Sequence, residues 1–272
     1  MEEIFDTKDF AKAIKEKEDE VFFIKKGEKK ALVSIKRKSP ILKRITSRAQ
    51  IFTSSENEDF LEEVLKKMKE IGVVYSRIGN TMFGLKDKPF INLEGINIIE
   101  RHTFILDLKV NKEKLWKNLN KKTRNAIRKA EKEKIIVEKI KTEKELEEYY
   151  KLAKLSEKRI RKKRETFIAP PKSFFEYVFR EMVPKKMAIF LIAKYENKII
   201  AGALFFHTKD KIIYYHSCSL REYSGKQAPS KIQWESIIYA KKRKLKIYDL
   251  GGCTLGLTKR DSRFFIYEYK RK

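Results

Sequence analysis

The sequence predicts an α+β protein built as a tandem duplication, with mixed sheets flanked by helices. An order of hairpin, third strand, helix and closing strand appears near the start of the 272-residue chain and recurs about 170 residues later. Apolar residues make up 42% of the chain, which is enough to build a core. No apolar run reaches the ~18 residues that a membrane span needs, so no span is predicted.

The first copy of this order lies in the N-terminal part of the chain. Two apolar-rich runs joined by a polar turn predict the hairpin. We expect Ser55 and Glu58 to form a capping box that begins the helix, and Gly72 to end it. The elements expected in order are strands 21–25, 31–37 and about 41–52, the helix, and strand 73–78.

The second copy repeats the order near the C-terminus. Its helix is preceded by Pro229, and its last strand runs into a turn at Gly251-Gly252. The elements expected are strands 187–195, 199–206 and 211–219, a helix over about 230–244, and strand 247–250. The alternative to duplication is that an order common in α+β proteins simply occurs twice.

Additional elements precede the second copy. One long helix is expected over 112–133, because its apolar residues share one side. Thr142 and Glu145 predict a capping box at the start of a later helix. The remaining elements expected are strands 102–108 and 135–140, a helix over 142–156 and a short helix over 173–182.

Charge is distributed unevenly along the chain. Residues 1–100 contain 20 Lys and Arg against 18 Asp and Glu, whereas the remainder contains 45 against 20. The net charge of +27 is therefore almost all in the second part, at +25. This asymmetry predicts an anionic ligand or partner for the second part, although some of these cations serve only solubility.

The cysteines and the N-terminus indicate the compartment. Two cysteines, Cys218 and Cys253, are too few for a disulfide scaffold and suit a reduced cytoplasm. The acidic N-terminus lacks the features of a signal peptide. We therefore expect a cytoplasmic protein with no membrane span, for which peripheral membrane contact stays open. Its use of Lys, Glu and Ile is typical of a thermophile.

Three stretches resemble a known family. They are "HTFILDLKVNKEKLWKNLNKKTRNAIRKAEKEKIIVEKI", "AIFLIAKYENKIIAGALFFHTKDKIIYYHSCSLREY", and "APSKIQWESIIYAKKRKLKIYDLGG" followed by "IYEYKRK". The chain resembles the FemABX aminoacyltransferases and the related FemAB-like acetyltransferases. FemABX members have two GNAT-like units in tandem and move an amino acid from aminoacyl-tRNA to a peptide amine of a cell-wall precursor.

The resemblance implies a division of the chain and a fold. It implies a GNAT-like unit at 1–100, which matches only in layout, and a second GNAT-like unit at 101–272 that carries the catalytic cleft. It also implies that tRNA and an anionic, amine-bearing acceptor are partners. No cofactor is implied beyond aminoacyl-tRNA as co-substrate.

Motifs of other reaction types are missing from the sequence. There is no G-x-S-x-G elbow, no H-E-x-x-H pair and no Walker A loop. GNAT enzymes bind the coenzyme A pyrophosphate with Q/R-x-x-G-x-G/A, but Arg221 and Gly225 are one residue too far apart for it and Pro229 removes an amide donor. This favours the tRNA-dependent branch over coenzyme A as donor.

The candidate site residues follow from the resemblance and from charge. By resemblance, Lys270 lies where the family places a lysine close to the reacting carbonyl. An ammonium there either stabilises the developing oxyanion or anchors the terminal phosphate-sugar of the tRNA, and Tyr269 shapes the pocket beside it. Asp249 is expected to cap the Gly251-Gly252 turn or to bind substrate. Residues expected to bind an anionic acceptor are Arg164 and Tyr215. Residues expected to bind tRNA are Lys121, Arg124, Arg128 and Arg221.

A metal or Cys-His centre is a weaker possibility. His216 and Cys218 alternate onto one face of a predicted strand, and His207 lies on its neighbour. We interpret them as satisfied core positions and expect no metal.

Three functions remain open from the sequence. The first is tRNA-dependent aminoacyl transfer, the second is coenzyme A-dependent N-acyl transfer, and the third is non-catalytic binding of RNA or another polyanion. The sequence does not identify the amino acid transferred or the acceptor.

Overall fold

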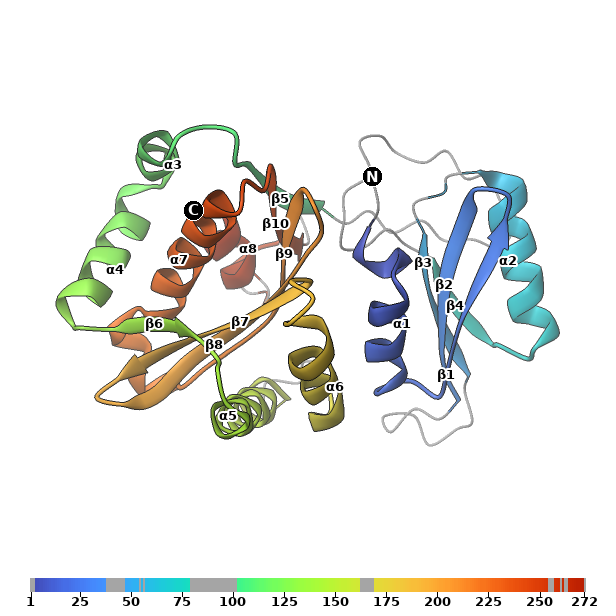
Figure 1. The fold of residues 1–272 in the computed structure, drawn as a ribbon, viewed down its shortest axis with the longest axis horizontal. Helices are drawn as coiled ribbons and strands as arrows, with labels where there is room; N and C mark the ends of the chain where they lie inside the picture. Colours follow the sequence, from blue (N-terminus) through green and yellow to red (C-terminus); the bar gives the residue numbers. More distant parts are fainter. Residues whose placement is uncertain are drawn as a thin grey trace. The chain divides into compact units, whose positions relative to one another are not determined.

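Two separate sheets organise the chain, one of four strands and one of six (Figure 1). They belong to two compact units, Met1–His102 and Thr103–Lys272. The computed structural model describes residues 3–37, 47–53, 55, 57–78, 102–161, 169–253, 257–259, 261 and 264–271. Within those ranges, none of the helices combines the length and apolar character needed to cross a bilayer.

The first unit is a β1-β2-β3-β4 sheet with a helix on each face (Figure 1). Strand β2 is buried on both faces: Val33 packs in a cluster with Phe60 and Val64 of α2, and Leu32 lies on the opposite face. On that second face, Phe10 of α1 contacts Phe52 edge-on at 6.0 Å between ring centroids. The elements are η1 (Ile4–Asp6), α1 (Lys8–Lys15), β1 (Glu20–Lys26), β2 (Lys29–Lys36), β3 (Arg48–Thr53), α2 (Glu58–Glu70) and β4 (Tyr75–Ile78).

The helix α2 begins differently from the prediction. The expected capping box of Ser55 and Glu58 is wrong, because the Asn57 side chain accepts from the Phe60 backbone N–H at 3.0 Å and begins the helix. Asn caps a helix as well as Ser does, and it lies two residues nearer the apolar run. Gly72 does end the helix, with φ of +73°. The first half of the expected third run, 41–46, lies outside the described residues.

The second unit is a β5-β10-β9-β8-β7-β6 sheet. Helices α5 and α6 cover one face, and α7 covers the other with α4 packed outside it (Figure 1). The elements are β5 (His102–Asp107), α3 (Lys112–Asn118), α4 (Lys121–Lys132), β6 (Ile136–Lys139), α5 (Glu143–Arg161), α6 (Lys172–Tyr177), η2 (Val178–Met182), β7 (Ala188–Tyr195), β8 (Lys198–His207), β9 (Lys211–Ser219), η3 (Arg221–Lys226), α7 (Ala228–Lys242), β10 (Ile247–Cys253) and α8 (Phe264–Arg271).

Strand pairing confirms the tandem fold. In the first unit β1–β2 and β2–β3 are antiparallel, and β3–β4, joined across α2, is parallel. In the second unit β7–β8 and β8–β9 are antiparallel, and β9–β10, joined across α7, is parallel. The four repeated strands therefore have the same topology in both units, as the repeated order predicted, and the second unit adds β5 beside β10 and β6 beside β7.

The single helix predicted over 112–133 is wrong. Helix α3 ends at Asn118, Leu119 is extended, and α4 begins at Lys121. The Asn120 side chain accepts from the Thr123 N–H at 2.8 Å, so it caps a new helix within a continuous apolar pattern. The predicted apolar side is confirmed, since Leu115 and Ile127 are both buried.

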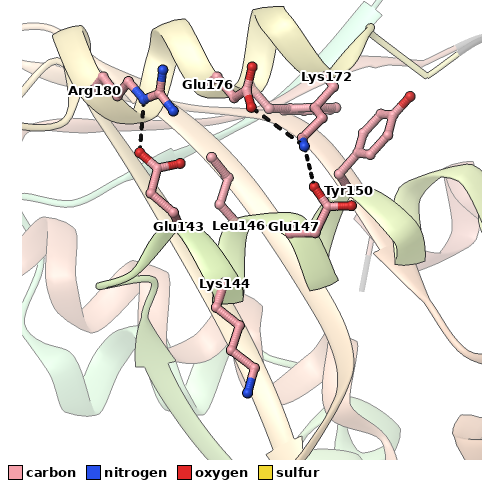
Figure 2. Close-up of a pocket in the computed structure, with 9 residues that line it drawn as sticks. Glu143, Lys144, Leu146, Glu147, Tyr150, Lys172, Glu176 and Arg180 are labelled. Carbon is pink, nitrogen blue, oxygen red and sulfur yellow. Dashed lines mark hydrogen bonds and ion pairs between the residues drawn. The ribbon is translucent and has the colours of Figure 1, made fainter.

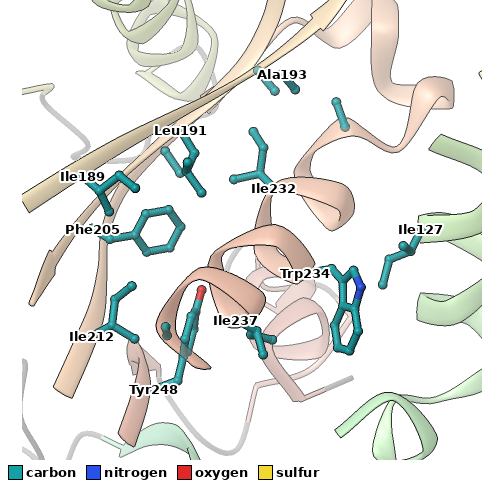
Figure 3. Packing of buried hydrophobic residues seen from close by; sticks show 14 of the residues in the cluster. Ile127, Ile189, Leu191, Ala193, Phe205, Ile212, Ile232, Trp234, Ile237 and Tyr248 are labelled. Atoms are coloured by element: carbon teal, nitrogen blue, oxygen red, sulfur yellow. The ribbon is translucent and has the colours of Figure 1, made fainter. Parts of the chain in front are cut away.

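The core of the second unit lies between α7 and the sheet (Figure 3). Ile189, Leu191 and Phe205 project from the strands toward Ile232 and Ile237 of the helix. On the outer side of α7, the rings of Trp234 and Trp116 lie 4.9 Å apart and attach the α3–α4 layer.

Candidate functional site

Strands β9 and β10 pair over only part of their length. Their parallel register runs from Ile247↔Lys211 to Asp249↔Ile213, although β10 extends to Cys253 and β9 to Ser219. In β9 the register against β8 then shifts, so that Tyr215 is the extra residue of a β-bulge. The ends of both strands are therefore available to side chains from other elements.

Lys270 of α8 reaches the end of β10. Its Nζ donates to the carbonyl oxygens of Gly251 and Gly252, at 3.0 Å each. Gly251 has a φ of +74°, and a Cβ there would lie 3.1 Å from the Tyr214 carbonyl oxygen and 3.5 Å from Lys270 Nζ. Glycine is favoured both by the backbone conformation and by the close approach of the Tyr214 carbonyl oxygen.

Asp249 lies beneath this contact and is fully buried. Its Oδ1 accepts from the Thr103 hydroxyl and, at 2.8 Å, from the Gly251 N–H. The predicted capping of the Gly251-Gly252 segment is thus present, although β10 continues through it as a strand. Burial raises the pKa of the Asp249 carboxyl, against hydrogen bonds and the nearby charges of Lys211 and Lys270.

Three phenols surround the same strand ends. Burial raises the pKa values of Tyr214, Tyr248 and Tyr269, so their hydroxyls are neutral at physiological pH. The Tyr248 hydroxyl lies 2.7 Å from Ser236 Oγ. Tyr269 is 37% exposed, while its hydroxyl is buried and hydrogen-bonded to Ser230 of α7. Tyr269 is therefore partly accessible, with its polar end fixed.

The residues expected to bind the acceptor are placed differently. Arg164 lies outside the described residues. Tyr215 is half-buried, with its ring stacked on Phe174 of α6 at 5.8 Å and edge-on to Phe206 at 4.8 Å. Tyr214 instead packs with the α7-side core, as the alternation of a strand requires, and the bulge leaves Tyr215 on the same face as His216, which contacts Phe175 of α6.

The residues expected to bind tRNA lie on α4 and η3. Lys121 and Arg128 are exposed on α4, where the Arg128 guanidinium lies 5.5 Å from the Trp116 ring. The Arg124 guanidinium instead donates to the carbonyl oxygens of Lys117, at 3.0 Å, and Leu119. Arg124 therefore ties α4 to the end of α3. Arg221 is exposed at the start of η3.

Side chains hold the turn before α7 in place. Lys226 pairs with Glu133 of α4 at 2.6 Å and lies over the Tyr195 ring at 4.1 Å. Gln227 has a φ of +58°, and Pro229 occupies the first turn of α7. This is the turn in which the coenzyme A motif is missing from the sequence.

The buried histidines and cysteine are core groups, as the sequence predicted. The Tyr149 hydroxyl is 2.7 Å from His216 Nδ1, and Cys218 lies against the Gly202 carbonyl. Burial lowers the pKa values of His207 and His216 to about 4 and raises that of Cys218. Across the described ranges, no group of three His, Cys, Asp or Glu side chains is placed to hold a metal ion.

A pocket of about 340 Å³ lies between α5 and α6, apart from β10 and α8 (Figure 2). Arg180 pairs with Glu143 at 2.8 Å, and Lys172 pairs with Glu147 at 2.5 Å. Because these charges are already paired across the two elements, we assign the pocket a structural role.

Sequence reasoning missed two members of the site around Lys270. Thr103 comes from β5, which neighbours β10 only in the folded sheet. The Gly251-Gly252 pair was a signal of close backbone approach, but we interpreted it as a turn.

The chain has clear relatives in family and in fold. A family model described as "Acetyltransferase (GNAT) domain" matches residues 117–271. In a sequence search, no curated protein matches the chain.

Three solved structures are similar over most of the chain. FemX has a TM-score of 0.66 at 15% identity, covering 98% of this chain and 88% of its own. A conserved protein of unknown function from Bacteroides thetaiotaomicron has a TM-score of 0.63 at 10% identity, covering 97% of this chain and 84% of its own. The C-terminal domain of a putative lysylphosphatidylglycerol synthetase from Agrobacterium fabrum has a TM-score of 0.54 at 10% identity, covering 88% of this chain and 72% of its own.

At such identities these structures show the fold alone, and they confirm the FemABX resemblance at that level. The family model adds the general chemistry, which is acyl transfer. Because that model spans more than half of the chain, the protein belongs to the acetyltransferase (GNAT) domain family, with the fold of FemX.

Proposed function

We propose that the protein transfers an aminoacyl group from aminoacyl-tRNA to an amine of an anionic acceptor, such as a peptidoglycan precursor. The observation that carries the proposal is the Lys270 ammonium, held by two carbonyl oxygens at 3.0 Å where β9 and β10 stop pairing. The chemistry is assigned to residues 101–272, and residues 1–100 form a second GNAT-like unit.

The proposed reaction needs no covalent enzyme intermediate. The acceptor amine attacks the ester carbonyl, a C–N bond forms, and the C–O bond to the terminal ribose breaks. The amine proton leaves, and the ribose oxygen is protonated. Charge develops on the carbonyl oxygen in the transition state, where the ammonium of Lys270 stabilises it by about 2–4 kcal/mol.

The charge distribution supports tRNA as donor. Residues 109–134 contain eleven Lys and Arg against three Asp and Glu. Lys121 and Arg128 lie on the exposed face of α4, and Arg221 is exposed on η3. A handful of such phosphate contacts gives strongly salt-dependent binding. In this proposal Arg124 acts by tying α4 to α3.

The remaining assignments concern the acceptor and the acceptor end of the tRNA. Tyr269 is partly exposed, which suits stacking on an unpaired base beside Lys270. Tyr215 and Arg164 are proposed to contact the acceptor. Asp249 is buried, so we propose that it supports the site through its hydrogen bond to the Gly251 backbone. The putative lysylphosphatidylglycerol synthetase with a similar fold is named for a product that contains a lysyl group, which is consistent with aminoacyl transfer.

Coenzyme A-dependent N-acyl transfer is the second candidate, favoured by the family match itself. It requires a pyrophosphate site other than the usual loop, because the turn before α7 lacks the motif and contains Pro229. Saturable binding of coenzyme A at micromolar concentrations would favour this candidate. A non-catalytic polyanion-binding protein would instead keep its RNA affinity and turn over no donor.

A transfer assay tests the leading proposal. Charged tRNAs and peptidoglycan precursors are incubated with wild-type protein, Lys270→Met and the neighbouring control Arg271→Met. We expect Lys270→Met to lower transfer by about 10²-fold or more, with little change in melting temperature. Arg271 pairs with Glu268 at the surface, so its variant should stay active. Full activity of Lys270→Met would exclude the role given to this lysine.

A further inference from the structure

We propose that Asp249 is a positioning residue that aims the Lys270 ammonium through the backbone of Gly251. The proposal rests on the function proposed above for the task of Lys270. The path from carboxylate to ammonium is independent of that function.

The path has two hydrogen-bonded steps. Asp249 Oδ1 accepts the Gly251 N–H at 2.8 Å, and the Gly251 carbonyl oxygen accepts from Lys270 Nζ at 3.0 Å. The N–H and the carbonyl belong to successive peptide planes. Fixing the first plane therefore leaves only the two backbone dihedrals of Gly251, of which φ is +74°, to set where the second plane points.

The carboxylate itself is fixed from a third element. Thr103 of β5 donates its hydroxyl to the same Oδ1, and Asp249 is fully buried between β5 and β9 in the sheet. A buried carboxylate is costly to retain unless its interactions repay its desolvation. Among the described residues its Oδ2 has no hydrogen-bond partner, so its retention is not explained by packing.

Lys270 needs such guidance because of its own flexibility. A lysine side chain has a large rotamer entropy, and Lys270 projects here from an eight-residue helix. Carbonyl oxygens from two consecutive residues fix the ammonium in one place only if their peptide planes are themselves fixed. Asp249 supplies that constraint from below.

The test observes the lysine ammonium directly. In ¹H–¹⁵N spectra selective for lysine NH₃⁺ groups, Lys270 is assigned by the signal missing from Lys270→Arg. Lys241 is a matched internal control, because its Nζ also donates to two carbonyl oxygens, those of Leu108 and Val110. Lys241→Arg assigns it in the same way.

In Asp249→Ala, which removes the acceptor of the Gly251 N–H, we expect the Lys270 signal to move or to broaden beyond detection through faster proton exchange. The Lys241 signal should stay in place. Gly251→Ala should displace the same signal from the other side, since a φ of +74° strains an alanine and its Cβ would crowd the Tyr214 carbonyl oxygen. An unchanged Lys270 signal in Asp249→Asn and in Asp249→Ala would overturn the proposal.

Activity separates this inference from the proposed function. If transfer is detected, Asp249→Ala should lower kcat by about 10²-fold and leave the KM for donor within about twofold, because a misplaced group costs rate rather than binding. If no donor is ever turned over, the proposed function fails while the spectra still decide the positioning role. If Asp249→Ala and Asp249→Asn both lose activity with an unchanged Lys270 signal, the positioning role fails alone.

Discussion

Tyr149 illustrates, at the scale of a residue, how one side chain organises a face of the second sheet. It is fully buried, its hydroxyl is 2.7 Å from His216 Nδ1, and its ring meets Phe175 and Phe190 edge-on at 5.4 and 5.2 Å. A Cβ at Gly202 would lie 2.6 Å from this ring. Glycine at position 202 of β8 therefore leaves the space that the Tyr149 ring occupies.

Gly202→Ala should accordingly destabilise the protein by about 1–3 kcal/mol, because the ring is held on several sides and cannot move away. Gly225→Ala is the matched control, since no heavy atom lies within 4 Å of its added Cβ. Urea unfolding of both variants measures the difference. Equal urea midpoints for the two variants would mean that the Tyr149 ring moves aside without loss of stability.

Two buried histidines predict how stability depends on pH. Burial lowers the pKa values of His207 and His216 from 6.5 to about 4, and the charges of Arg243 and Lys139 contribute at His207. Between these values the unfolded chain binds protons that the folded chain does not. Stability is therefore fully present above pH 6.5 and decreases as the pH falls toward 4.

Between pH 7 and 5.5 we expect a loss of about 1 kcal/mol for each histidine. His216→Gln should remove its share of this dependence, because glutamine does not titrate. Urea unfolding at the two pH values, in wild type and variant, measures it. An identical pH dependence in both proteins would contradict the burial of a neutral imidazole at this position.

At the scale of the element, hydrophobic periodicity predicted where most helices and strands lie, and capping decided where they begin. The Thr142–Glu145 box is confirmed, with the Glu145 N–H donating to Thr142 Oγ1 at 3.2 Å. The helix caps at Asn57 and Asn120 were not predicted. Ser55 is an equally suitable capping residue near Asn57, and the apolar pattern continues through Asn120 without a break. Capping preferences are nearly equal for Asn and Ser, so they do not decide which of two nearby residues begins a helix.

Asn120→Ala tests the break between α3 and α4. Loss of the cap should destabilise the protein by about 1 kcal/mol, because the Thr123 N–H loses its acceptor. Asn125→Ala is the control, since Asn125 is exposed within α4 and alanine favours a helix there. If both variants unfold at the same urea concentration, the Asn120 cap does not stabilise the separation of α3 from α4.

The candidate site was only partly predictable from sequence. Resemblance located Lys270 and Tyr269, but not the helix α8 that positions them. Thr103 and Asp249 are 146 residues apart, and their contact depends on β5 pairing beside β10. No local pattern encodes that neighbour relation, so the support beneath Lys270 became apparent only in the folded sheet.

At the scale of the whole molecule, the two units share a topology and differ in charge. Residues 1–100 have a net charge of +2 and the remainder has +25, although β1–β4 of the first unit and β7–β10 of the second pair in the same way. Topology therefore does not require the cations. Many lie on the α3–α4 layer, which packs on α7 through apolar residues and leaves its charged face exposed.

This separation predicts that RNA binding can be removed without unfolding the chain. The triple variant Lys121→Glu, Arg128→Glu, Lys132→Glu reverses exposed charges on α4. Binding of a labelled tRNA acceptor hairpin, measured by fluorescence anisotropy over a salt series, should weaken, and its log–log salt slope should fall by about 2–3. The control Lys25→Glu, Lys66→Glu, Lys69→Glu makes the same net change on exposed positions of the first unit and should bind as wild type does. Equal weakening in both variants would mean that the RNA responds to net charge alone, and displacement of the hairpin by coenzyme A would favour a nucleotide thioester as the donor.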